Sequence, residues 1–337
     1  MQVVTVRQET DLVDYYDRRY QDGYMDRWES VKVDKVLEFV GEAVGNRPLR
    51  LLDYGCGTGE FAGAISRRFP QLEVWGCDLS PEALARARRK HPGLRFATTA
   101  ELQESRTRFD LLFTHHVIEH VFDLEATLAE MAALLAPGGE MVHILPCGNP
   151  GSLEQRLVAR IEGGIEGEGR RFFFEDPGHL RRLTSDDLAR PLGRHGFALR
   201  RAWYANQSWG GVRWLTANLA DAAEITPVAR GRNPGDRLAL AAYRSGLVGL
   251  ALLRHPGALW RRLRRADRRR FGPVKRAAYL AAWPVLGVLR WPSTLLDVGL
   301  TRLAEAEWRD RREQPHGSEM YLYFVSQGPE EAAGAGR

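Results

Sequence analysis

The sequence predicts a doubly wound α/β fold, in which helices cover both faces of a mostly parallel sheet. Between about residues 49 and 147, short apolar runs alternate with amphipathic stretches. Parallel strands need long crossover connections, usually helices, so this alternation is typical of βαβ units. A glycine-rich turn after the first apolar run and an acid at the end of the second are also common in such folds.

Five strands are expected in this part of the chain. They are LRLLDY (49–54), EVWGCD (73–78), LRFAT (94–98), FDLLFT (109–114) and EMVHILP (140–146). Helices are expected over 60–69, 80–90 and 124–135. Ser80 is a good N-cap and Pro81 a good first helical residue, and Asp123 can cap the third helix, which should end at the Pro137-Gly138-Gly139 run.

The pattern is looser after Pro150. We expect helices over 152–163 and 188–195, the second capped within 184–187 and disturbed by Pro191, and strands over 196–204 and 319–327. A glycine-rich acidic loop (162–169) is expected to be mobile. These elements divide the chain into an N-terminal cap helix (1–30), a core (31–207 plus 318–327), a helical insertion (208–317) and a disordered tail (328–337).

The composition is that of a soluble globular protein, with 44% hydrophobic and 27% charged residues among 337. Three cysteines without a C-x-x-C pair predict neither a disulfide framework nor a cysteine zinc site. The first twenty residues carry charges where a signal peptide needs an apolar run, and no apolar stretch reaches about 18 residues. We therefore expect a cytoplasmic protein.

The net charge of +5 is unevenly distributed. Residues 254–276 contain ten Arg or Lys against one acid, a local charge of +9, so the remainder carries −4. The basicity belongs to one segment, and it predicts a local partner rather than a generally basic protein.

The stretch DYGCGTG (53–59) follows the first predicted strand and opens a helix. Glycines there let a nucleotide-like ligand approach the backbone closely. A dinucleotide fingerprint would place its third glycine where this chain has Glu60. Asp53 and Glu60 disfavour a polyphosphate and suit a cation, while Asp78, at the end of the second strand, can accept both hydroxyls of a ribose.

Four motifs together resemble the class I S-adenosylmethionine-dependent methyltransferases. They are LLDYGCGTGEF (51–61), GCDLSPEAL (76–84), FDLLFTHHVIEHV (109–121) and LLAPGGEMVHILP (134–146). Within that class the chain looks like the type 11 group, near the ubiquinone-biosynthesis O-methyltransferases. The resemblance covers about 31–207 and 319–327, and it implies a Rossmann-like seven-stranded sheet with an antiparallel last strand and S-adenosylmethionine as cofactor.

The resemblance also assigns the donor site. It implies Asp53, Gly55, Cys56, Gly57 and Gly59 around the methionine part, Asp78 on the ribose, Leu79 beside the adenine, Thr99 and Ala100 after the third strand, His115 after the fourth, and Tyr20 from a cap helix that also carries Tyr15 and Tyr16. Family members often place an acid on the adenine amine where this chain has Thr99. That adenine contact is therefore open.

Residues 115–120, HHVIEH, contain an H-x-x-E-H pattern found in some zinc proteases. Such a protease needs a long helix and a third ligand, whereas this segment leaves a strand beside the predicted donor site. Some ubiquinone-pathway relatives carry E-x-x-E-H here and bind a divalent ion, but His116 replaces the first acid. We expect no metal, and His116, His120 and His179 as candidate general bases, with a structural turn as the alternative.

The insertion contains two apolar stretches, 238–253 and 277–289, on either side of an arginine-rich segment. Apolar helices beside arginines and tryptophans are typical of membrane-interface elements, so one expectation is a peripheral contact with the inner face of the membrane through 238–291. The alternatives are a cap over the active site or a dimer element. Binding of nucleic acid through the arginines is the least favoured interpretation.

From these observations we expect a methyltransferase that acts on a small, hydrophobic or lipid-linked acceptor, most readily at oxygen. An RNA methyltransferase and a non-catalytic cofactor-binding module are the alternatives. The acceptor, the pathway and the oligomeric state do not follow from the sequence.

Overall fold

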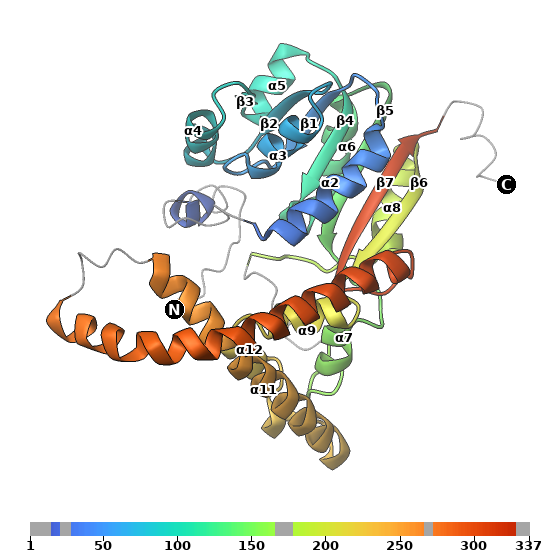
Figure 1. Cartoon of the computed structure of the whole chain (residues 1–337). Coiled ribbons are helices and arrows are strands. Elements are labelled where there is room, and N and C mark those ends of the chain that lie inside the picture. The colour runs from blue at the N-terminus through green and yellow to red at the C-terminus, as the bar shows by residue number, and fades with distance from the viewer. Residues whose placement is uncertain (1–14, 21–27, 166–177, 266–271, 328–337) are drawn as a thin grey trace. The chain divides into compact units, whose positions relative to one another are not determined.

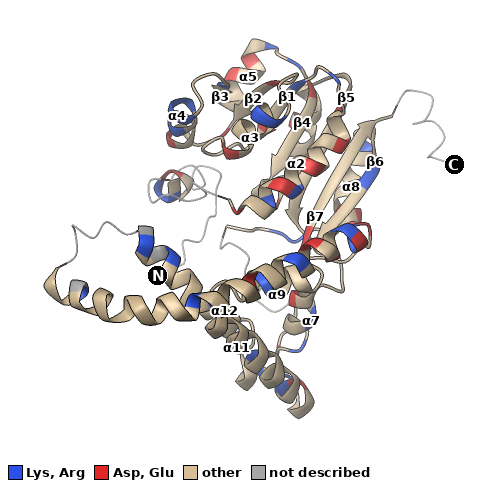
Figure 2. Cartoon of the chain, in the orientation of Figure 1, with Lys and Arg blue, Asp and Glu red and all other residues tan. Residues whose placement is uncertain are grey.

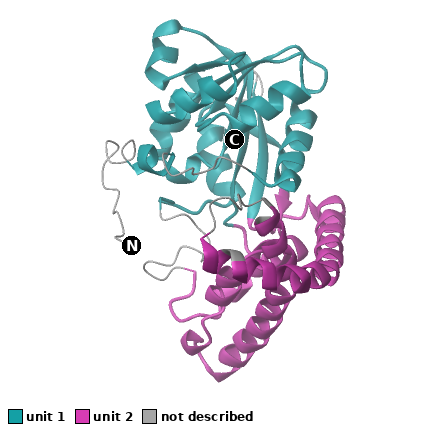
Figure 3. Cartoon of the chain, turned by 60° about the vertical axis from the view of Figure 1, so that its left-hand side comes forward, with its two compact units in different colours: residues 1–148, 176–203, 319–337 teal, residues 149–175, 204–318 magenta. Residues whose placement is uncertain are grey.

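The computed structural model describes residues 15–20, 28–165, 178–265 and 272–327. Much of the predicted cap (1–30), part of the acidic loop (162–169), part of the arginine-rich segment and the predicted tail (328–337) lie outside these ranges. The chain divides into two compact units, of which the first comprises 1–148, 176–203 and 319–337 and the second 149–175 and 204–318 (Figure 3).

The first unit is built on a seven-stranded sheet of order β3-β2-β1-β4-β5-β7-β6 (Figure 1). The strands are β1 (Arg50–Tyr54), β2 (Glu73–Cys77), β3 (Arg95–Ala97), β4 (Phe109–His115), β5 (Leu135–Pro146), β6 (Phe197–Ala205) and β7 (Glu319–Ser326). Strands β1 to β5 pair in parallel, and β7 pairs antiparallel with β5. The predicted Rossmann-like sheet with an antiparallel last strand is confirmed.

The chain reverses its direction of winding between β1 and β4, which are neighbours in the sheet. Ligands of open α/β sheets bind outside the carboxyl ends of the strands at such a switch point. Asp53 pairs with Phe113 across these two strands, so the glycine-rich turn and the HHVIEH segment leave the sheet side by side.

Helices α2 (Ser30–Val44), α3 (Glu60–Arg68), α4 (Pro81–Lys90), α5 (Thr99–Ser105), α6 (Leu124–Ala133) and α8 (Ser185–Arg194) cover the sheet. Their starts follow local chemistry, because Ser80, Thr98, Asp123 and Thr184 each accept a backbone N–H of the first turn. In Figure 1, α2 lies in front of the sheet and α6 behind it.

Helices α2 and α5 were not predicted, and β5 and α8 differ from expectation. Strand β5 begins at Leu135 rather than at residue 140, because the Pro137-Gly138-Gly139 run is part of the strand and shifts its register against β4. Gly138 takes a φ of 80°, which accommodates this irregularity. Helix α8 contains Pro191 without ending there, and its start is fixed by a capping box between Thr184 and Asp187.

The second unit is helical. It contains α7 (Leu153–Val158), α9 (Trp209–Leu215), α10 (Leu219–Glu224), α11 (Pro234–Arg265) and α12 (Pro273–Arg311), with a 3-10 turn at Val228–Arg230. Its core gathers Leu157, Ile161, Leu215, Ile225, Leu240 and Leu247. No helix among the described residues is long and apolar enough to span a bilayer.

Helix α7 ends at Val158, earlier than the predicted 163, because the following residues bond elsewhere. Glu162 donates its backbone N–H to the carbonyl of Arg230 at 2.7 Å, and Ile161 forms a bridge with Gly231. The unit holds 204–318, close to the predicted insertion, and also 149–175, which the sequence analysis assigns to the core.

Candidate active site

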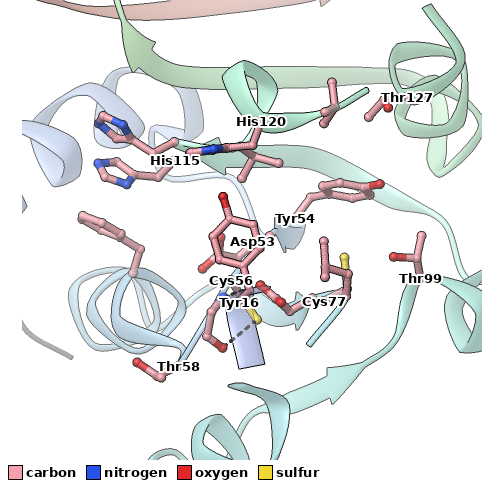
Figure 4. Close-up of a pocket in the computed structure, with 18 of the residues that line it drawn as sticks. Tyr16, Asp53, Tyr54, Cys56, Thr58, Cys77, Thr99, His115, His120 and Thr127 are labelled. Carbon is pink, nitrogen blue, oxygen red and sulfur yellow. Dashed lines mark hydrogen bonds between the residues drawn. The ribbon is translucent and has the colours of Figure 1, made fainter. Parts of the chain in front are cut away.

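A cavity of about 610 Å³ lies at the switch point of the first unit (Figure 4). It is lined by residues that follow β1, β2 and β4, by aromatic side chains near the N-terminus and by one face of α6. In Figure 4, His115 lies on one side of the cavity and Thr99 on the other. The cavity thus joins the glycine-rich turn to the HHVIEH segment.

The glycine-rich turn needs residues without a Cβ. Gly55 has a φ of 76°, and a Cβ there would lie 2.4 Å from Val117 Cγ2. Gly57 has a φ of 52°, and its Cβ would lie 2.7 Å from the hydroxyl of Tyr20. Left-handed backbone and close neighbours together explain why only glycine fits at both positions.

Asp53, the last inward-facing residue of β1, is 2% exposed. Its Oδ2 atom is buried and has no hydrogen-bond partner among the described residues. Burial raises the pKa of this carboxyl to about 8, with a smaller contribution from the nearby Asp78, although a backbone hydrogen bond with Ala62 opposes the rise. A carboxylate held in this way is stabilised by a cationic ligand group.

Asp78 accepts the backbone N–H of Gly57 at 2.8 Å and that of Ser80 at 2.9 Å. These bonds fix the carboxylate at the carboxyl end of β2, while burial still raises its pKa to about 6. Leu79 follows it in the cavity lining and is 44% exposed. Asp78 is therefore oriented to accept hydrogen bonds from a ligand.

The end of the cavity near Thr99 contains an acid that the sequence analysis did not identify. Glu101 is engaged in a capping box, in which its carboxylate accepts the backbone N–H of Thr98 at 2.7 Å. Instead, Glu130 of α6 lines the cavity and accepts the hydroxyl hydrogen of Tyr54 at 3.0 Å. The carboxylate at this end of the cavity therefore comes from α6 rather than from the segment after β3.

Aromatic rings surround His115 at the opposite end. The ring of Trp28 lies 4.7 Å from it, edge to face, and that of Phe61 lies 4.2 Å away. Burial, together with the Lys32 charge, lowers the pKa of His115 well below its usual value, so its ring is neutral.

The N-terminal helix at 15–20 packs against the start of α4. Tyr16 and Tyr20 form a buried cluster with Ala83, and Asp17 bonds the hydroxyl of Ser80. Both tyrosines line the cavity. The described part of the predicted cap therefore covers the glycine-rich turn.

His116 lies between two buried carboxylates, at a φ of 55° that is uncommon for a non-glycine residue. Its Nδ1 atom is 2.9 Å from Glu119 Oε1, and its Nε2 atom is 3.1 Å from Glu319 Oε1. Burial and the charge of Lys32 lower its pKa, but the two carboxylates outweigh them and the net pKa is raised.

Lys32 of α2 completes this group. Its ammonium pairs with Glu319 at the start of β7 and lies 3.3 Å from His116 Nε2. Burial opposes ionisation of Glu319, but Lys32 and His116 hold its pKa well below the usual range. Lys32 and the raised pKa of His116 therefore offset the charge of the two carboxylates, and both ring nitrogens of His116 face a carboxylate oxygen.

His120 lies one turn further on, in the 3-10 helix Ile118–His120. Its Nε2 atom is 4.0 Å from Glu119 Oε1, and its buried Nδ1 atom has no hydrogen-bond partner among the described residues. The rings of Tyr16 and His179 pack against it at 5.7 and 4.5 Å. His120 lines the cavity, whereas His179 is not among the described residues that line it.

Two groups of side chains have the spacing of metal ligands. They are His116, Glu119 and His179, and His115, His116 and Glu319, with ligand atoms within 4.8 Å of one another in each group. In both groups His116 would have to lose the proton that the carboxylates favour. The expectation of no metal stays a prediction, but the zinc-protease alternative is wrong, since the motif spans a strand end and a 3-10 turn.

Most of the residues predicted for the donor site meet in this cavity. Its lining includes Asp53, Gly55, Cys56, Gly57, Asp78, Leu79, Thr99, His115 and Tyr20, while Gly59 caps α3 and Ala100 belongs to the first turn of α5. Trp28, Tyr54, Phe61, Val117 and Glu130 also line the cavity but were not predicted. For Tyr54, Phe61 and Val117 a signal existed, because all three lie within the recognised motifs.

A doubly wound sheet with a glycine-rich turn and two buried acids beside a cavity at its switch point is typical of proteins that bind a nucleotide-like cofactor. A methyltransferase-domain family matches residues 20–202, more than half of the chain. The chain therefore belongs to this family of methyltransferases, and it is an enzyme of the class I S-adenosylmethionine-dependent type.

Curated relatives with assigned acceptors are similar over part of their length. The trans-aconitate 2-methyltransferase of Methylobacterium nodulans is 36% identical over 34% of this chain and 45% of its own. The malonyl-[acyl-carrier protein] O-methyltransferase of Halorhodospira halophila is 31% identical over 46% and 55%. The ubiquinone biosynthesis O-methyltransferase of Nitrobacter winogradskyi is 33% identical over 51% and 66%. The chain thus spans about half to two thirds of these proteins.

The cofactor of this family is S-adenosylmethionine. The residues present fit it, because Asp53 offers a buried carboxylate oxygen without a partner and the glycine turn leaves room that a Cβ would fill. We propose that Asp53 and the turn hold the methionine part, that Asp78 holds the ribose, and that Tyr54 and Glu130 hold the adenine edge.

Proposed function

We propose that this enzyme methylates a hydroxyl or phenol oxygen of a small hydrophobic or lipid-linked acceptor, and that His120 is the general base. The observation that carries the proposal is His120, whose side chain lines the cavity and whose buried Nδ1 atom has no hydrogen-bond partner among the described residues. A neutral hydroxyl must lose a proton as it is methylated, so a base at this position assists transfer to oxygen.

The cavity lining supports an uncharged acceptor. Tyr16, Trp28, Phe61, Val121 and Phe122 supply apolar surface beside the histidines. The described residues that line the cavity include five carboxylates but no lysine or arginine. A polycarboxylate such as the trans-aconitate of some relatives would lack a cationic partner here. The names of two relatives specify methylation at oxygen, which agrees with the proposal.

S-adenosylmethionine supplies an electrophilic methyl group when bound. Its methyl group would pass to the acceptor oxygen, with the sulfonium sulfur as the leaving group. His120 Nδ1 takes the hydroxyl proton, and Glu119, 4.0 Å from the other ring nitrogen, stabilises the imidazolium that results. The aromatic lining excludes water, while Glu119 and Glu319 raise the pKa of His116 and face both of its ring nitrogens, so we assign His116 no part in the proton transfer.

The proposal revises the three candidate bases. His116 faces carboxylates through both nitrogens, and His179 stands outside the cavity lining, so we assign the proton transfer to His120 alone. Replacing His120 by Gln should lower kcat by about 10²-fold or more while leaving the affinity for S-adenosylhomocysteine within about twofold. His179→Gln is the matched control, because it alters a buried ring of the same cluster.

The acceptor class is tested by transfer of labelled methyl groups into separated lipid, small-metabolite and RNA fractions. Label should enter neutral hydroxyl compounds in the lipid or metabolite fraction. Label found only in RNA would replace the proposal by an RNA methyltransferase. Tight binding of S-adenosylhomocysteine with no transfer to any fraction would instead favour a non-catalytic module.

A further inference from the structure

Helix α12 buries one narrow stripe and leaves the opposite face exposed. The buried positions recur every seven residues, at Tyr279, Leu286, Ser293 and Leu300. Ser293 lies at the contact with α11, where its hydroxyl accepts the N–H of Gly257 at 3.1 Å and donates to the carbonyl of Arg254 at 2.8 Å. This stripe is therefore the seam between the two long helices of the second unit.

The opposite face is apolar over several turns. Leu280, Val288, Trp291 and Leu295 are 64%, 70%, 63% and 71% exposed. Their spacing of eight, three and four residues places them along one side of the helix, about 22 Å long at about 1.5 Å per residue. We call these four residues the α12 apolar face. Large exposed apolar patches are uncommon on proteins that have no partner there.

Cations flank this face, and acids are absent from it. The sequence has no Asp or Glu between residues 268 and 296, and Arg290 is the single charged residue within 277–296. The Arg290 guanidinium lies 4.2 Å from the ring centroid of Trp260 and 4.9 Å from that of Trp291. Arg264 and Lys275 are exposed near the adjoining ends of the two helices. Figure 2 shows the largely uncharged first half of α12.

We propose that the α12 apolar face binds the surface of an anionic lipid membrane. An apolar helix face next to arginine and tryptophan is typical of a helix that lies within the interface, with its charges toward the headgroups. Anionic headgroups would attract the basic segment, which carries +9 over residues 254–276. The proposal does not depend on which acceptor the enzyme methylates.

Other occupants match the face less well. In a symmetric dimer this face would meet the same face of a second copy, which offers no acidic partner for Arg290 because the sequence has no Asp or Glu between residues 268 and 296. Nucleic acid binds aromatic and cationic side chains, whereas three of the four residues here are aliphatic. The apolar stretch at 238–253 is a weaker candidate, because Leu240, Leu247 and Ala251 belong to the core of the unit.

Flotation of the full-length enzyme with lipid vesicles tests the proposal. The intact protein should float with vesicles that contain phosphatidylglycerol, should float much less with phosphatidylcholine alone, and should be released as salt is raised. Replacing Leu280, Val288 and Leu295 together by Gln should lower the bound fraction by about tenfold or more. The control replaces the exposed Leu238 and Leu253 of α11 by Gln.

The variants must keep their helical circular dichroism and their binding of S-adenosylhomocysteine, which shows that the fold and the donor site are intact. Failure of the intact protein to float with anionic vesicles, or equal loss in the control, would overturn the proposal. A dimer that the triple variant dissociates, without vesicle binding, would assign the face to a second copy. RNA binding without vesicle binding would also overturn it.

Discussion

Replacing Asp53 by Asn should stabilise the ligand-free enzyme and abolish tight donor binding. The folded protein holds this carboxyl at a pKa of about 8 because of burial, against 3.8 for an exposed aspartate. Between these values the folded state binds more protons than the unfolded state, so stability falls as pH rises. Above pH 8, this pKa difference lowers the free energy of unfolding by at most about 6 kcal/mol. Asparagine keeps the shape and can still accept the backbone hydrogen bond.

Urea unfolding of both proteins from pH 4 to pH 9 measures this effect. The free energy of unfolding of the wild type should fall relative to that of the Asp53→Asn variant as pH rises, and the gap should level off above pH 8. Asp187→Asn is the control of opposite sign, since hydrogen bonds from Thr184 and the charge of Arg190 lower the pKa of that carboxyl despite some burial. An Asp53→Asn variant no more stable than the wild type at pH 8 would refute the reasoning.

Three further outcomes are expected. Glu319→Gln leaves Lys32 and His116 without their shared carboxylate and should cost about 3–5 kcal/mol at pH 7 in denaturant titrations, and the loss should shrink below pH 4.5, where the carboxyl of the unfolded chain becomes protonated. Tyr54→Phe should raise the Kd for S-adenosylhomocysteine by about fivefold in calorimetry without changing the fold, and an unchanged Kd would remove Tyr54 from the site. Gly55→Ala should lower the thermal midpoint, and adding Val117→Ala should restore part of it, because the new methyl otherwise meets the valine.

The sheet and most of the cofactor-binding residues could be predicted from the sequence because the patterns that indicate them lie within short segments. Strand periodicity, the glycine spacing and the acid at 78 lie within short segments whose order along the chain fixes their order in the sheet. The caps of α4, α6 and α8 were equally local. The start of β5 was missed because Pro137 and two glycines look like a turn, whereas Leu135 before them and Glu140 after them both pair with β4 and keep the strand continuous.

The acceptor half could not be predicted in the same way. Whether a histidine in HHVIEH is a base depends on what faces its ring, and two of the three partners of His116 come from residues 32 and 319. Neither partner belongs to a recognisable motif. Glu130 was missed for a related reason. A glutamate in an amphipathic helix is normally expected to face solvent, and only the structure shows that a cavity lies beside α6.

The separation between His116 and Glu319 has a consequence for how the enzyme is made. The two residues are 203 positions apart, yet they meet in the finished site. A ribosome that adds about 5–20 residues per second delivers Glu319 about 10–40 s after His116. The donor turn can form early, but until β7 is added Lys32 and His116 lack their shared carboxylate. In a nascent chain arrested before β7, the His116 end of the site is incomplete. Such a chain should therefore bind S-adenosylhomocysteine weakly or not at all, and methyl transfer should appear only as synthesis ends.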